Sequence, residues 1–96
     1  LLSQESTMTH LRPADAVYAR MFDDELVILD LNRGEYFALN EIGAELWGGL
    51  EKGKTLVEIA EAVVQRYDVT RERALADIME LCNELLTRGL IVDEHA

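Results

Sequence analysis

The residues that could act as nucleophiles, general bases or metal ligands are few and far apart in this sequence. The chain has a single cysteine, Cys82, and two histidines, His10 and His95, which lie near its two ends. Nucleophilic catalysis needs a serine or cysteine beside a base such as histidine, and a zinc site needs closely spaced cysteine and histidine ligands. Neither pattern is present, so we expect no enzymatic activity, no metal and no cofactor.

Carboxylate and glycine motifs are no more specific. The chain contains 19 Asp and Glu among 96 residues, so pairs such as Asp23-Asp24 arise by chance and are typical of solvated faces. Gly48-Gly49, followed by Gly53, lacks the Lys-Ser/Thr pair of a phosphate-binding loop. We interpret Cys82, which lies in an apolar helical stripe, as a small buried side chain rather than a reactive thiol.

Length and charge exclude several classes of protein. Ninety-six residues suffice for one domain. Nine Lys and Arg are scattered among 19 Asp and Glu, and the resulting net charge of −10 repels nucleic acid and anionic membrane surfaces. One cysteine cannot form an internal disulfide, and no apolar run reaches membrane-spanning length. We therefore expect a cytoplasmic protein with neither nucleic acid nor membrane as a partner.

The first half of the chain follows the rules for strands. Residues 17–22 and 26–29 are rich in apolar and β-branched side chains and flank the turn-forming pair Asp23-Asp24. Asn32-Arg33-Gly34 forms a second tight connection, and residues 35–39 read as a third strand. The economical arrangement is an antiparallel meander in which the third strand is an edge.

The second half follows the rules for helices. Asn40 is a predicted N-cap for a short helix that carries Trp47 towards the core, and Gly53 follows its end. Thr55 begins a second helix over residues 56–67, and Thr70 a third that ends at Arg88. Residues 90–92 are expected to form a short closing strand. The fold class is therefore α+β, with three strands followed by three helices.

We expect the folded domain to span residues 16–92. Residues 1–15 are predicted to be a disordered N-terminal segment, and residues 93–96 a frayed tail. Because the first methionine is Met8, we expect residues 1–7 to be foreign to the natural protein.

The open edge of the sheet is the feature most suggestive of function. An unpaired strand edge can accept an extended peptide by β-augmentation, and the long third helix beside it would form one wall of a groove. The same edge could equally be covered by the chain's own tail. The pattern by itself leaves both readings open.

Two segments of the chain resemble the PqqD-like family of small peptide-recognition proteins. The first is residues 25–40, with the sequence ELVILDLNRGEYFALN, followed by Gly43 and Leu46-Trp47. The second comprises Gly53-Lys54-Thr55, the helix over 59–67, Asp77-Ile78 and the terminal residues 85–91. The resemblance covers about residues 16–92.

The resemblance implies a winged helix-turn-helix fold and a non-catalytic function. Members of this family bind the leader segment of a ribosomally made precursor peptide and present it to a modifying enzyme. The chain is most similar to the stand-alone leader-binding proteins of lasso-peptide pathways. Their partners are a cysteine-protease-type leader peptidase and a cyclase, so the expected partners are the precursor leader and such a peptidase or another modifying enzyme.

The resemblance also implies which residues hold the leader. In such proteins the leader lies antiparallel to the third strand, with its apolar side chains beside the third helix. The third strand would contribute mainly backbone contacts, from Glu35, Tyr36, Phe37, Ala38 and Leu39. The third helix would contribute the side chains of Ala74, Leu75, Ile78, Met79 and Cys82. A secondary set could fix the register of the leader by charge, and consists of Arg71, Arg73, Asp77 and Glu80.

Two other functions fit the same architecture. A winged helix-turn-helix can bind DNA, but residues 70–88 carry three arginines against four carboxylates, which disfavours contact with phosphates. A homodimer that pairs the edge strands of two copies is the other alternative.

Overall fold

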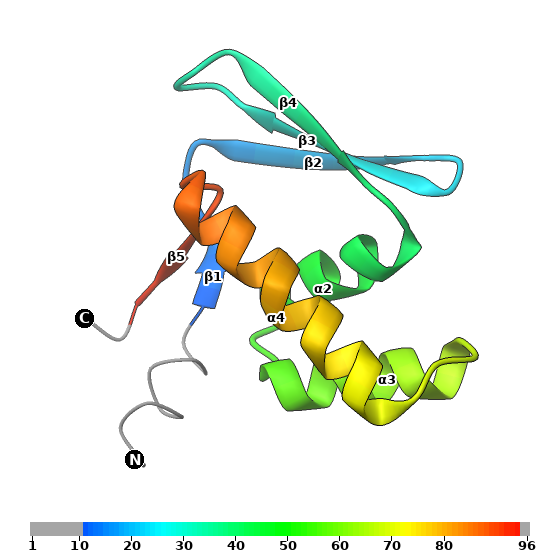
Figure 1. Cartoon of the computed structure of the whole chain (residues 1–96). Coiled ribbons are helices and arrows are strands. Elements are labelled where there is room, and N and C mark those ends of the chain that lie inside the picture. The colour runs from blue at the N-terminus through cyan, green and yellow to red at the C-terminus, as the bar shows by residue number, and fades with distance from the viewer. Residues whose placement is uncertain (1–10, 95–96) are drawn as a thin grey trace.

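The computed structural model describes residues 11–94 and contains an antiparallel sheet laid over a layer of helices (Figure 1). The sheet consists of β2 (Val17–Phe22), β3 (Glu25–Asp30) and β4 (Glu35–Leu39), in the order β2-β3-β4. The predicted meander is confirmed, as is the position of β4 at one edge. The predicted α+β class, with three strands followed by three helices, is confirmed as well.

The two turns of the sheet follow from their residues. Asp23 adopts a left-handed backbone conformation (φ 55°) between β2 and β3, which Asp tolerates better than most residues. Gly34 has φ 68° before β4, where a side chain would be strained. The buried carboxylate of Asp30 accepts a hydrogen bond from the backbone N–H of Asn32 at 3.0 Å, which holds the β3–β4 turn in place.

The helices begin where the capping residues predict. They are α2 (Glu41–Glu51), α3 (Leu56–Arg66) and α4 (Arg71–Thr87). Asn40 caps α2, Thr55 forms a capping box with Glu58 at the start of α3, and Thr70 caps α4. None of the helices between residues 11 and 94 is long and apolar enough to cross a membrane.

A second, small sheet corrects the predicted boundaries. Leu11–Pro13 forms β1 and pairs antiparallel with β5 (Ile91–Asp93), although residues 1–15 were predicted to be disordered. Leu11 and Ile91 are buried in the core. The Nε atom of Arg12 donates to the Glu94 carboxylate at 2.6 Å, which ties together two segments that were predicted to be loose. The expectation for residues 1–7 lies outside the described residues.

The core lies between the inner face of the sheet and the three helices. Leu26 and Ile28 contribute from β3, and Trp47 contributes from α2 with only 2% of its surface exposed. The predicted core position of Trp47 is confirmed. Its indole N–H has no acceptor among the described residues, which is uncommon for a buried donor.

The contact between α2 and α3 depends on a glycine. A Cβ atom at Gly49 would overlap with Cγ1 of Ile59, a buried residue of α3. At the preceding position, Gly48, a Cβ atom would meet no atom within 4 Å. Two adjacent glycines of one helix therefore have opposite roles: Gly49 permits close packing, whereas Gly48 is not needed for packing.

These two positions give a matched test of the packing. Gly49→Ala should lower the free energy of unfolding by about 1–3 kcal/mol because the methyl group overpacks the interface. Gly48→Ala should raise it by about 0.5–1 kcal/mol because alanine favours the helix. Urea denaturation of both variants checks the pair. Equal effects would show that α2 and α3 do not approach each other as closely as described.

Candidate functional site

A groove separates the edge strand β4 from the helix α4. Its volume is about 540 Å³, and both walls contribute apolar and charged side chains. The wall formed by the sheet and the start of α2 consists of Glu25, Phe37, Ala38, Leu39, Asn40 and Ile42. The wall formed by α4 consists of Asp77, Glu80, Leu81, Glu84, Leu85 and Arg88.

The edge of β4 supplies unpaired backbone groups to this groove. Within residues 11–94, β4 pairs with β3 alone, from Leu26 opposite Leu39 to Asp30 opposite Glu35. In an antiparallel strand, the N–H and C=O groups of alternate residues point to opposite edges. The outer edge of β4 is thus able to form a hydrogen-bonded ladder with another extended chain.

The helical repeat decides which side chains of α4 face β4. Ala74, Ile78 and Cys82 form the stripe that is buried in the core. Residues 77, 81, 84 and 88 recur at the same helical spacing on an adjacent flank, and all four line the groove. Leu81 and the buried Leu85 make the apolar floor, and acidic residues border it.

Arg88 connects the two walls at one end of the groove. Its guanidinium carbon lies 4.4 Å from the centroid of the Phe37 ring, within the range of a cation–π contact. Its Nε atom also donates to the Glu84 carboxylate at 3.3 Å. The remaining lining charges are the carboxylates of Glu25, Asp77 and Glu80. The groove is therefore acidic apart from Arg88.

Three helix residues assigned to the groove from the sequence belong to the core instead. Ala74, Ile78 and Cys82 are buried, with at most 2% of their surface exposed. The apolar stripe was taken for a binding surface, but it is the stripe that packs α4 against α2 and α3. Leu85 is equally buried but lines the groove, whereas none of these three residues lines it.

Leu75 and Met79 also lie away from the groove. Neither lines it, and Met79 is two positions from both Asp77 and Leu81, which places it on the far flank of α4. Of the strand residues, Phe37, Ala38 and Leu39 line the groove, whereas Glu35 and Tyr36 do not.

The secondary set of charged residues divides in the same way. Asp77 and Glu80 line the groove. Arg71 pairs with Glu61 of α3 at 3.0 Å, which turns it away from the groove. Arg73 donates to the Asp77 carboxylate at 3.1 Å and so contacts the groove only through that residue.

Sequence reasoning missed several groove residues, mainly Ile42, Leu81, Glu84, Leu85 and Arg88. One signal was available for Leu81. It is apolar but falls one position before Cys82, so that it widens the apolar stripe towards one side. Leu75 and Leu86 widen the stripe on the opposite flank and are also half-buried, so the pattern does not indicate which flank faces β4.

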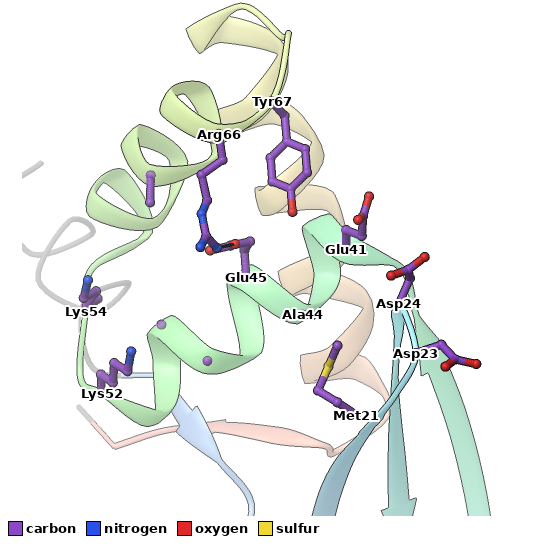
Figure 2. A pocket seen from close by; sticks show the side chains of 13 residues that line it. Met21, Asp23, Asp24, Glu41, Ala44, Glu45, Lys52, Lys54, Arg66 and Tyr67 are labelled. Carbon is purple, nitrogen blue, oxygen red and sulfur yellow. Dashed lines mark hydrogen bonds and ion pairs between the residues drawn. The ribbon is translucent and has the colours of Figure 1, made fainter.

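A second cleft lies between α2, α3 and the β2–β3 turn (Figure 2). Its volume is about 370 Å³, and an ion pair between Glu45 and Arg66 crosses it. Partial burial raises the pKa of Tyr67, and the nearby Glu41 and Glu45 carboxylates raise it further. These groups join two helices by charge, and no histidine or cysteine lines the cleft.

The described residues offer little for catalysis. No group of three or more His, Cys, Asp and Glu within residues 11–94 could hold a metal ion. Burial raises the pKa of the Cys82 thiol to about 11, so the thiol stays protonated at neutral pH. The open edge of β4 and the adjoining groove are suited to binding an extended peptide.

Comparison with protein families decides the relationship. Residues 25–91 match the family described as coenzyme PQQ synthesis protein D (PqqD). The chain belongs to the PqqD family. The matched residues run from the start of β3 to the start of β5 and include both walls of the groove. No curated protein sequence matches the chain.

Two solved structures share the PqqD fold of this chain over most of its length. TbiB1 in complex with the TbiA(beta) leader peptide is 34% identical, with a TM-score of 0.78 over 88% of this chain and 96% of that one. A lasso peptide synthetase B1 complexed with the leader peptide is 28% identical, with a TM-score of 0.80 over 86% of this chain and 98% of that one.

The burial of Cys82 has a measurable consequence. At about pH 8, a thiol reagent such as DTNB should label the native protein far more slowly than the protein in urea, because the thiol is protonated and closed off. A saturating groove ligand should slow the labelling of Cys82 in the native protein only as far as it stabilises the whole fold against unfolding. Rapid native labelling that such a ligand blocks would return Cys82 to the binding surface.

Proposed function

We propose that this PqqD-family protein binds the leader segment of a ribosomally made precursor peptide in the groove between β4 and α4. The leader would add an antiparallel strand to the edge of β4 and press alternate side chains towards α4. The observation that carries the proposal is the open edge of β4 beside an apolar-floored groove. Both similar structures are complexes with a leader peptide, which supports it.

The two walls have different tasks in this proposal. Backbone hydrogen bonds along β4 contribute about 0.5–1.5 kcal/mol each and tolerate many sequences. The small side chain of Ala38 allows another strand to approach the edge closely. Selectivity then depends on the apolar floor, where Leu81 and Leu85 would contact apolar leader side chains.

Charge narrows the choice of leader further. Asp77, Glu80 and Glu84 border the groove along α4. A leader that places a lysine or arginine beside these carboxylates gains an attraction, although exposed pairs contribute only up to about 1 kcal/mol. Such contacts set the register of the added strand more than the affinity.

In this proposal the protein catalyses no step itself. It would act in the cytoplasm and deliver the bound leader to a cysteine-protease-type leader peptidase or another modifying enzyme of lasso-peptide or related biosynthesis. The support for a non-catalytic function is the protonated, buried Cys82.

We also infer that the finer fold type is a winged helix-turn-helix, with α3 and α4 as the helical pair. That fold type makes DNA binding the second candidate function. The charge of α4 disfavours DNA binding, because the carboxylates of Asp77, Glu80 and Glu84 line its exposed flank. DNA is therefore the control ligand.

The direct test is a titration of the protein against the fluorescently labelled leader peptide of its proposed precursor, followed by anisotropy. A scrambled leader and a DNA duplex serve as controls. Saturable binding of the authentic leader only is the expected result. Saturable binding of the duplex without binding of the leader would replace the proposal by the DNA-binding alternative.

A matched pair of variants tests the groove itself. Leu81→Gln should weaken leader binding by at least about tenfold, since burial of a leucine contributes about 1.5–3 kcal/mol and each 1.4 kcal/mol is tenfold. Met79→Gln, the same change on the far flank of α4, should alter the affinity by less than about twofold. Thermal unfolding checks that both variants fold. A larger loss for Met79→Gln would move the site to the other flank.

A further inference from the structure

The outer face of the three-stranded sheet carries large apolar side chains that no other described element covers. Tyr18 is 62% exposed, Phe22 56% and Tyr36 73%. The outer face points away from the helices, which lie under the opposite face (Figure 1). A shallow hollow of about 580 Å³ lies on it, lined by Tyr18, Ala19, Arg20, Phe22, Val27, Leu29 and Tyr36.

The strand register gathers these side chains into one surface. Tyr18 pairs with Leu29, and Leu29 pairs with Tyr36, so the three form a row across all three strands. The next row contains Val27 between Arg20 and Ala38. Antiparallel sheets that cover a core on one side usually place polar residues on the other. Apolar residues on both faces indicate that a second surface packs here.

The surrounding charges restrict what that surface is. Asp23, Asp24 and Glu25 lie at the β2–β3 turn, with Glu25 directly opposite Phe22. Arg20 is the charged residue that lines the hollow. A second copy of this chain would bring another net charge of −10 against these carboxylates. A partner that presents apolar side chains bordered by lysine and arginine is complementary.

The outer face is also continuous with the groove. Tyr36 and Ala38 lie on β4, the strand to which a leader would be added, and Ala38 lines the groove. An added strand would turn every second side chain towards the outer face. A protein seated on this face would therefore contact both the sheet and the bound leader.

We propose that the outer face of the β2-β3-β4 sheet docks a second protein that acts on the bound leader, and that this protein presents an apolar patch bordered by basic side chains. The docking rests on the proposed leader binding, but it uses a separate surface. Tyr18 and Phe22 belong to β2, which is separated from the edge of β4 by β3. Changes at these positions can therefore affect docking without touching the groove.

The experiment compares two double variants of the full chain. Tyr18→Ser/Phe22→Ser removes apolar surface from the outer face, and Val57→Ser/Met79→Ser removes it from exposed positions on α3 and α4. The probe is a purified cysteine-protease-type leader peptidase of the proposed pathway, titrated with and without leader by biolayer interferometry. Leader affinity is measured separately by anisotropy, and thermal unfolding confirms that each variant folds.

The outer-face variant should bind the enzyme at least about tenfold more weakly while its leader affinity changes by less than about twofold. The control variant should keep both affinities. Enzyme binding that is absent from the unaltered protein, or equal in the two variants, would overturn the proposal. The proposal would also be overturned if the unaltered protein were a dimer, the outer-face variant were a monomer, and the variant still bound the enzyme. If the unaltered protein did not bind the leader, the proposed function would be overturned instead.

Discussion

The packing of α4 against α2 and α3 determines which side chains of α4 form its wall of the groove. Ala74, Ile78 and Cys82 are closed off by this contact. Because successive residues of a helix are separated by about 100°, burying this stripe determines the direction of every other side chain of α4. A rotation by one residue would bury a different stripe and turn Leu81 away from its present place beside β4.

The sheet adds a second constraint, which is its small size. With three strands, one strand is central and two are edges, so β4 keeps one edge open while its partner β3 is paired on both sides. The helices cover only the inner face. The same sheet thus has an edge that can pair with a peptide and an outer face that can pack against another protein. Both follow from the absence of a second layer among the described residues.

The sequence predicted the local elements well because their signals are local. Asn40, Thr55 and Thr70 cap the three helices, and Gly34 marks the turn before β4. In the small sheet, the closing strand predicted at residues 90–92 is confirmed as β5 (Ile91–Asp93), but β1 and its pairing with β5 were missed. Each of its strands has three residues, and they pair across about eighty residues of intervening chain, so no period or turn near either strand reveals the other.

By itself, the sequence determined the order of strands and helices, the edge position of β4 and the resemblance that led to peptide binding. The tertiary structure decided which flank of α4 faces β4. Hydrophobic periodicity identifies the stripe that is buried, but it cannot separate a core stripe from a binding surface, because both are apolar at the same spacing. Only the placement of α4 against its neighbours assigns Ile78 to the core, Leu81 to the groove and Met79 to the far flank.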